Sequence, residues 1–514
     1  MPNGRLFKRN KLMQSNMKKK WSFAIGFIGL LLLAFSFFNK QMLREPFGLI
    51  LAFGLMSVGG LFYFKAHYGK TPPGINNNGV WFNALTGRGL WGWVLGLVLT
   101  GFYVALYWFP EVLGYDPKGS SGMVAFFDPL SVALNGKPAT QWFLYGTLYT
   151  FAILLFGVKF LWKYRQNNYQ IIRTLSVMFF QLGFAYFIPE LLSALHPNTP
   201  YFAKDLKNMW PLQYYFFEEW HLNNMLQGGR LGSFFLVFGL LLIFVISPLL
   251  TYWFGKRWYC SWVCGCGGLA ETAGDPFRQL SSKKISVWKV ERWMIHVVLV
   301  FVSITTLAAL WSFMTLHPDA FFFNRYEFLG SLLALGSTAL VGLGLAMRKA
   351  FDKTVQYSFW SVGVVLLTAL TLPLFTSPQE LFYISHHSLQ HSYGFAIGGA
   401  FSGVLGVGFY PILGSRVWCR FGCPMAAILG VQQRLFSRFR ISTNGGQCIS
   451  CGNCSSYCEM GIDVRAYAQK SEPIVRASCV GCGICATVCP RGVLKLENGP
   501  VSTRTLAEED RFIL

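Results

Sequence analysis

Long apolar stretches separated by short polar segments follow one another along most of the chain. A helix needs about twenty apolar residues to cross a hydrocarbon layer of ~30 Å. Ten stretches reach or approach that length. The pattern predicts about ten membrane-spanning helices, at 21–38, 46–64, 89–109, 140–162, 171–194, 231–254, 293–313, 329–347, 358–375 and 394–413.

The positions of the basic residues predict the orientation of these helices. When the basic N-terminus is placed inside, only eight of the 44 Lys and Arg residues fall in loops assigned to the outside. Loops on the cytoplasmic side of membrane proteins are enriched in Lys and Arg. We therefore expect a multi-pass protein of the bacterial inner membrane with both termini in the cytoplasm. No small-residue cleavage site follows the first apolar stretch, which predicts an uncleaved first span.

The composition supports membrane lipid as the surroundings of this chain. Hydrophobic residues make up 53% and charged residues 13% of the sequence, whereas a soluble domain has about 25% charged residues. A net charge of +22 could indicate a nucleic-acid partner. Because the basic residues are spread over many short loops instead of forming one face, we attribute the charge to topology and expect no nucleic-acid partner.

Eight of the 13 cysteines are concentrated in two runs near the C-terminus. Both runs have the spacing C-x2-C-x2-C-x3-C, which is typical of proteins with two [4Fe–4S] clusters. In that arrangement the fourth cysteine of each run reaches the other cluster. Zinc sites more often use C-x2-C pairs separated by a longer spacer. The predicted ligand sets are Cys448, Cys451, Cys454 and Cys489 for one cluster, and Cys479, Cys482, Cys485 and Cys458 for the other.

A second cysteine constellation consists of two C-x3-C motifs at the inner ends of predicted spans. Cys260 and Cys264 form the first pair, and Cys419 and Cys423 form the second. An arginine precedes each pair by three residues, so that the two motifs look like an internal repeat. Cysteines at i and i+4 of a helix share a face. Two interpretations stay open: the pairs converge on a metal or cluster, or they shape the membrane face without a metal.

The order of these parts resembles the NosR/NapH family of membrane polyferredoxins over residues 231–500. Its members carry two C-x3-C-P motifs at span ends, followed by a double [4Fe–4S] domain. The resemblance implies electron exchange between the quinone pool or a cytoplasmic donor and a respiratory redox partner. This chain departs from the pattern at Gly265, where proline is expected, at Glu459, which replaces the usual proline after Cys458, and in lacking the covalent-flavin signature.

The fold class that we predict is an all-α polytopic membrane protein with a small C-terminal α+β ferredoxin-like domain that holds two clusters. Residues 1–230 are expected to form an N-terminal membrane region with about five spans. Residues 231–440 are expected to form the membrane core with the C-x3-C motifs. The double-cluster domain is placed at 441–500 and a C-terminal tail at 501–514.

Histidines in the predicted outer loops are further candidate metal ligands. His386, His387 and His391 lie close together, and a Glu218-Glu219-Trp220-His221 stretch precedes the sixth span. Imidazole binds metals and accepts protons near neutral pH, so an outer metal site or a quinol-deprotonation site is one interpretation. The alternative is a set of interfacial histidines that contact water and lipid head groups.

Three functions remain in competition at this level. The first is electron transfer between the quinone pool and a respiratory partner, which includes a possible quinol dehydrogenase subunit. The second is a metal-reducing assembly factor for a respiratory metalloenzyme. The third is a transporter. It is ranked last because the sequence offers no row of intramembrane charges for an ion path beyond Glu190. No span carries paired mid-membrane histidines for a haem, so that the route of electrons across the membrane is open.

Overall fold

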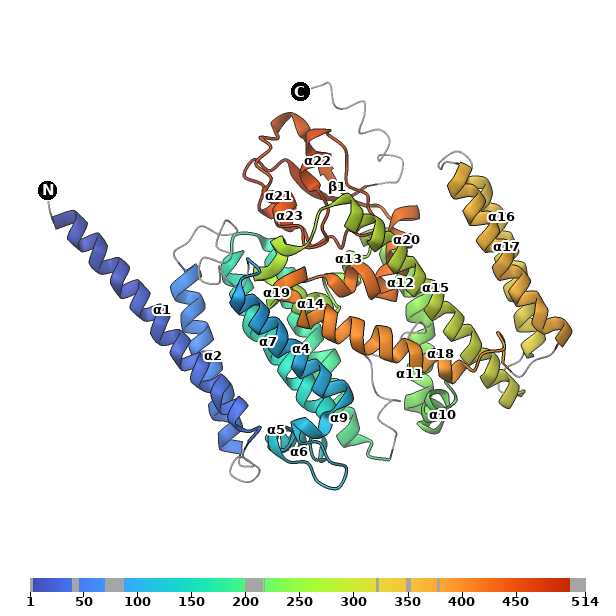
Figure 1. Ribbon diagram of the computed structural model, residues 1–514, viewed down its shortest axis with the longest axis horizontal. Helices are drawn as coiled ribbons and strands as arrows, with labels where there is room; N and C mark the ends of the chain where they lie inside the picture. The colour runs from blue at the N-terminus through green and yellow to red at the C-terminus, as the bar shows by residue number, and fades with distance from the viewer. Residues whose placement is uncertain are drawn as a thin grey trace.

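The protein is described here from a computed structural model, which covers residues 3–38, 46–69, 87–198, 216, 218–319, 323–347, 353–376 and 380–499. The predicted C-terminal tail, 501–514, lies outside these residues. Long helices dominate the structure, and a small module of short helices and two strands covers one end of them (Figure 1). The fold is therefore that of a helical membrane protein with a C-terminal appendage.

The N-terminal half contains five long helical segments. Their apolar sequences carry no interior proline except near α9, which begins with Ile188 and Pro189. The last segment is continuous from α8 through a π-helical stretch, η2, into α9. The segments are α1 (Asn3–Phe35), α2 (Pro46–Tyr68), α4 (Leu90–Trp108), α7 (Gln141–Lys163), and α8 (Asn168–Phe179) with η2 (Phe180–Phe187) and α9 (Ile188–Leu195).

The C-terminal half contains five further long segments. Two of them contain π-helical stretches, η5 and η7, and these two lead into the C-x3-C motifs. Wide π-turns interrupt helices most often near functional sites. The segments are α11 (Gly229–Leu241) with η5 (Leu242–Ile246) and α12 (Ser247–Phe254), α15 (Ile285–Leu316), α16 (Arg325–Met347), α17 (Lys353–Thr376), and α18 (His386–Tyr393) with η7 (Gly394–Gly408).

Seven helices in the described part of the chain are long and apolar enough to cross a membrane. They are α2, α4, α7, the segment from α8 to α9, the segment from α11 to α12, α15, and residues Phe359–Thr376 of α17. The other three predicted spans, 21–38, 329–347 and 394–413, coincide with α1, α16 and η7 followed by α19 (Tyr410–Leu413). The protein is thus a polytopic membrane protein, and its total of ten spans stays a prediction.

Short elements connect the long helices. On the side away from the C-terminal module lie η1 (Pro110–Leu113), α5 (Gly122–Ala125), α6 (Asp128–Asn135) and α10 (Glu219–Gln227) (Figure 1). On the module's side lie α13 (Arg257–Cys260), α14 (Gly265–Thr272), η6 (Asp275–Leu280), η8 (Trp418–Gly422) and α20 (Pro424–Phe436). The C-x3-C motifs occupy the second group, next to the module.

The C-terminal module is closed by an antiparallel pair of strands. Strand β1 (Phe439–Thr443) pairs with β2 (Leu494–Asn498), so that Phe439 lies opposite Asn498. Between the strands lie η9 (Gly445–Gln447), α21 (Asn453–Ser456), α22 (Val464–Gln469) and α23 (Ile484–Thr487). Its apolar core includes Ile441, Ile474 and Leu494, all nearly inaccessible to solvent. The α+β character expected for this region is present.

Candidate iron–sulfur sites

Two cavities in the C-terminal module are each lined by one of the predicted ligand sets. The first is lined by Cys448, Cys451, Cys454 and Cys489, and the second by Cys458, Cys479, Cys482 and Cys485. The fourth cysteine of each run therefore lies with the three cysteines of the other run. This crossed arrangement brings four thiols to each cavity, which fits the ligand number of a cubane cluster.

The local backbone explains why each run can surround a cavity. Gly452 and Gly483 occupy equivalent positions directly after the second cysteine, and their φ angles are +77° and +74°. A side chain would strain this left-handed conformation, whereas glycine adopts it freely. Each glycine is followed by a four-residue helix that carries the third cysteine. The turn therefore folds the loop back so that its three thiols face one point.

The sulfur atoms are farther apart than the ligands of a single zinc ion would be. Among the described residues, no three cysteine sulfurs lie within 4.8 Å of one another. Sulfurs bound to one tetrahedral zinc at ~2.3 Å would be roughly 3.8 Å apart. Burial also raises the pKa of the Cys458 and Cys482 thiols to about 11. Iron binding would replace the protons of these thiols, because thiolates are the ligands.

The two cavities differ in their surroundings. Cys451 of the first is exposed, and Cys448 and Cys489 are half-buried. Cys479 and Cys485 of the second are both only 7% exposed. The cysteines of the first cavity are therefore more exposed to solvent than those of the second.

Hydrogen bonds fix the loop of the second run to the membrane helices. Tyr169 donates its hydroxyl proton to the Gly481 carbonyl at 2.8 Å, and Gln170 donates to the Cys482 carbonyl at 2.9 Å. From other elements, Ser261 donates to Val480 at 2.8 Å and Gln433 donates to Cys479 at 2.9 Å. Four consecutive carbonyls, 479–482, are thus bound by side chains of α8, the first C-x3-C motif and α20.

Glu459 connects the module to the membrane core through ion pairs. Its side chain is fully buried and lies 2.9 Å from Arg278 Nη1 and 3.0 Å from Arg416 Nε. Burial alone would raise the pKa of Glu459. The neighbouring guanidinium groups outweigh this effect and hold the pKa below its ordinary value. One carboxylate oxygen lies within 4.8 Å of the Cys482 sulfur. The residue that replaces the usual proline therefore links the second cavity to two arginines of the core.

The ion pairs of Glu459 belong to a larger buried network. Arg416 also pairs with Glu271 at 2.7 Å, and Arg173 pairs with the same carboxylate. Arg278 pairs with Asp275 at 2.9 Å, and Asp275 also contacts Lys163 at 2.9 Å and Lys159 at 3.3 Å. Five cations thus face three carboxylates, which leaves an excess of positive charge. A cubane held by four thiolates is an anion, so this charge suits a neighbouring cluster.

The two C-x3-C motifs have similar backbone conformations, although the first contains an α-helical turn and the second a π-helical one. Gly255 and Gly414 precede them with φ of +65° and +96° and extended ψ. The Cys264 amide donates to the Tyr259 carbonyl at 2.8 Å, and the Cys423 amide donates to the Trp418 carbonyl at 3.0 Å. The internal repeat that the sequence suggested is therefore present in the structure.

The cysteines of each motif do not share one helix, so the expectation of an i, i+4 helical face was wrong. Cys264 and Cys423 are extended residues at which α14 and α20 begin. Proline at 424 disfavours a helical conformation of the residue before it, which ends the preceding turn. Each pair instead spans a turn between two helices, with Cys260 and Cys419 buried on the near side of it.

The four cysteines of the motifs nevertheless lie near one another. Cys260 and Cys419 belong to one buried cluster against which Cys423 packs, and the Cys264 thiol lies close enough to affect that of Cys423. Arg416 donates to the Cys419 sulfur at 3.6 Å and to the Cys260 carbonyl at 3.3 Å, so that it touches both motifs. Because Arg416 also pairs with Glu459, the network reaches from the second cavity to this cysteine quartet. Cys266 is exposed.

Only two of the three candidate histidines, His386 and His387, lie at a common site. His386 and His387, at the start of α18, lie next to Glu218. His391 is exposed one turn further along the same helix. His221 is buried, and its Nδ1 lies 3.0 Å from the Phe216 carbonyl. Glu218, which the sequence marked only as part of a neighbouring stretch, therefore joins the histidine pair.

Comparison with known proteins identifies [4Fe–4S]-binding domains in this chain. A family model described as a 4Fe-4S binding domain matches twice, at residues 237–287 and 395–442. A model described as a 4Fe-4S dicluster domain matches residues 447–494. The two matches of the first model cover the two C-x3-C motifs. The cysteine runs are thus parts of [4Fe–4S]-binding domains, as the spacing predicted.

One curated relative is named "Putative electron transport protein YccM", from Escherichia coli strain K12. It is 26% identical over 245 residues, which are 48% of this chain and 52% of the relative. The chain thus spans about half the length of this relative. No solved structure matches the chain. The similarity is that of a distant homologue with [4Fe–4S]-binding domains, and membership of the NosR/NapH family stays a prediction.

Proposed function

We propose that this protein is a membrane-bound electron-transfer protein whose redox groups are two [4Fe–4S] clusters in the C-terminal module. The observation that carries the proposal is the unequal placement of the two cysteine cavities. Cys451 at the first is exposed to solvent, and the loop of the second is bound to the membrane helices by Tyr169 and Gln170. A soluble donor or acceptor can approach the first site, while the second faces the membrane core.

The ligand assignment that we propose is supported by the lining of the two cavities. Cys448, Cys451, Cys454 and Cys489 hold the outward cluster, and Cys458, Cys479, Cys482 and Cys485 hold the membrane-facing one. When bound, each cluster supplies a one-electron redox couple whose potential depends on nearby charge and solvent exposure. Glu459 and its arginine partners set the charge around the membrane-facing site, and Gln170 and Gln433 orient its loop.

The cysteine quartet of the two C-x3-C motifs is assigned as a further iron–sulfur centre. Support comes from the shared neighbourhood of its thiols and from the 4Fe-4S binding domain model that matches both motifs. Replacing Cys423 with alanine is expected to lower the iron content of the purified protein by about four atoms per chain. Iron and acid-labile sulfide analysis measures this change. The matched control is Cys266→Ala, which removes a thiol that contacts Cys264 but belongs to neither C-x3-C pair, and it should leave the iron content unchanged.

Quinone and a respiratory redox protein of the bacterial inner membrane are the partners that we propose. The test uses the full chain in liposomes that contain a quinol, with cluster reduction followed by low-temperature EPR. Reduction by quinol, or reoxidation of reduced clusters by quinone, is the expected result. Clusters that exchange electrons with neither would contradict the quinone part of the proposal.

The alternative, a metal-reducing assembly factor, is favoured by one observation. Glu218, His386 and His387 form a group that could hold a metal ion. The two functions predict different deletion strains. An assembly factor leaves its target enzyme present but without metal, whereas an electron-transfer protein leaves a fully metallated target that lacks electrons. Metal analysis of the purified target enzyme distinguishes them.

A further inference from the structure

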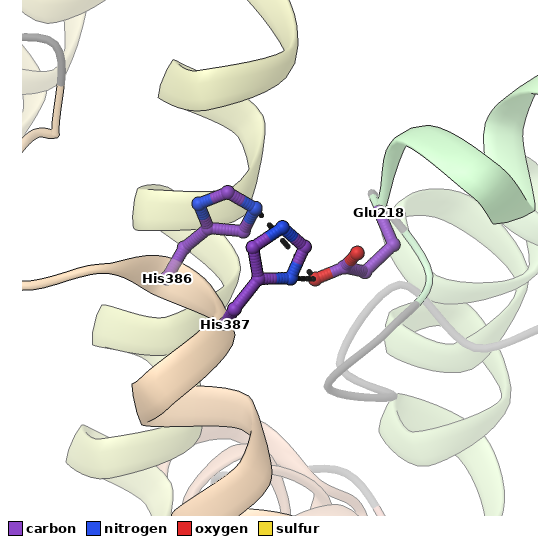
Figure 2. A group of neighbouring side chains, drawn as sticks. All are labelled: Glu218, His386 and His387. Carbon is purple, nitrogen blue, oxygen red and sulfur yellow. Dashed lines mark ion pairs between the residues drawn. The ribbon is translucent and has the colours of Figure 1, made fainter.

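Three side chains from two distant segments meet at the end of the helical bundle away from the iron–sulfur module. Glu218 precedes α10, and His386 and His387 are the first residues of α18. His386 Nε2 lies 3.8 Å and His387 Nδ1 lies 3.6 Å from Glu218 Oε1. Figure 2 shows both rings turned toward the carboxylate. One atom from each residue therefore faces a common point.

The distances match those between ligands of one metal ion better than those of hydrogen bonds. The three ligand atoms all lie within 4.8 Å of one another. Two atoms bound to a tetrahedral zinc at ~2.1 Å would be roughly 3.4 Å apart. Hydrogen bonds between nitrogen and oxygen are shorter, at about 2.7–3.2 Å. A small contraction around an ion would thus complete the site.

The environment of Glu218 indicates that a cation belongs here. Its side chain is only 2% exposed, and Oε1 accepts no hydrogen bond from the part of the chain that the structure describes. A buried acceptor without a donor is costly unless it coordinates a metal or meets an ion.

A further carboxylate orients the first histidine. His386 Nδ1 lies 3.2 Å from both carboxylate oxygens of Glu380. A carboxylate on one ring nitrogen fixes the tautomer of a metal-binding histidine and directs the other nitrogen to the metal. Nε2 of His386 then presents its lone pair toward the lone pairs of Glu218 Oε1. Two acceptors that face each other are stabilised when a cation lies between them.

We propose that Glu218, His386 and His387 bind a divalent transition-metal ion, with Glu380 as the residue that positions His386. Two imidazoles and one carboxylate are the donor set of open zinc sites and of non-haem iron sites. His387 is 70% exposed, so that the ion is accessible from solvent and keeps positions for water or another ligand. The site is independent of the electron-transfer function proposed above.

Helix α15 separates this site from the iron–sulfur module. At its start, Lys283 donates to the Ser456 carbonyl of the module at 3.4 Å. At its end, His317 Nε2 lies 3.1 Å from Glu219, the neighbour of Glu218. A helix of 32 residues is about 48 Å long. The proposed metal therefore binds at the opposite end of the membrane domain from the clusters. Its three ligands cannot also bind a cluster.

Zinc binding to the purified full-length protein tests the proposal. The protein in detergent is dialysed against Zn²⁺ with a competing chelator, and zinc, iron and acid-labile sulfide are measured in each sample. Wild type is expected to bind about one more zinc per chain than the Glu218→Gln and His386→Asn variants. Glu380→Gln is expected to weaken zinc binding by roughly 10- to 100-fold without abolishing it.

Matched controls separate the site from its neighbours. Glu219→Gln changes the adjacent carboxylate and His391→Asn changes an exposed histidine of the same helix, and both should retain zinc. Unchanged iron and sulfide in every variant shows that the chain is folded with its clusters. Equal zinc in wild type, Glu218→Gln and His386→Asn would overturn the proposal, as would an equal loss of zinc in His391→Asn.

Discussion

A Cys458→Ala variant is expected to lose the membrane-facing cluster, although Cys458 belongs to the first cysteine run. Its side chain lines the second cavity together with Cys479, Cys482 and Cys485. Loss of one thiolate ligand should lower the iron content by about four atoms per chain. The loop 479–482 keeps its side-chain hydrogen bonds to the helices, so that the protein should remain in the membrane. Iron, acid-labile sulfide and low-temperature EPR measure the loss.

Double variants distinguish crossed from local ligation. Cys458→Ala combined with Cys485→Ala removes two ligands of the same cavity and should lose no more iron than either single variant. Combined with Cys454→Ala, which lines the other cavity, it should lose about eight iron atoms per chain. A loss of only about four iron atoms in the second combination would mean that each run serves its own cluster.

A Glu459→Gln variant is expected to change both stability and redox potential. The substitution removes the negative charge that pairs with Arg278 and Arg416 inside a fully buried network. Removing one partner of a buried ion pair destabilises by about 3 to 5 kcal/mol. Removing a negative charge near Cys482 also favours the reduced, more negative cluster, so its midpoint potential should rise. Thermal unfolding in detergent and an EPR-monitored redox titration measure the two effects.

Glu497→Gln is the matched control for this variant. Glu497 is a carboxylate of the same module that pairs with Arg440 at 3.5 Å, and its side chain is 41% exposed. An exposed ion pair contributes about 0 to 1 kcal/mol, so that the melting temperature should change little. A similar loss of stability in both variants, with no change in potential for Glu459→Gln, would contradict the role assigned to the buried network.

Features that depend on neighbouring residues in the sequence were predictable. All ten predicted spans coincide with helical segments, because the length and hydropathy of a stretch are local properties. The crossed ligand sets stay a prediction from spacing, and the four cysteines of each set line one cavity. The repeat of the C-x3-C motifs was visible in the arginine and cysteine positions, and the matched family model covers both copies.

Features that depend on distant contacts were not predictable. Glu459 was recognised only as a departure from a pattern, because Arg278 and Arg416 reach it from two other segments. The network itself had a weak signal, namely Lys159 and Arg173 within apolar stretches, where charged side chains are rarely placed without a partner. Glu218 and His386 were noted in separate stretches, and only the fold shows that they meet.

The turn inside each C-x3-C motif could have been recognised from Pro424. The residue before a proline avoids the helical conformation, so Cys423 could not continue the helix of Cys419. Proline at the first position of a helix is instead common. In the first motif the same turn is made without proline, at Cys264 followed by Gly265.

The attachment of the second cysteine run to α8 and α20 has a kinetic consequence. With four carbonyls and Glu459 bound to the membrane core, the module cannot swing between a donor and an acceptor as a hinged carrier does. Transfer across that contact takes place at a fixed separation, so its rate should not depend on solvent viscosity. The encounter of a soluble partner with the exposed side at Cys451 is diffusive, so that this step should depend on viscosity and ionic strength.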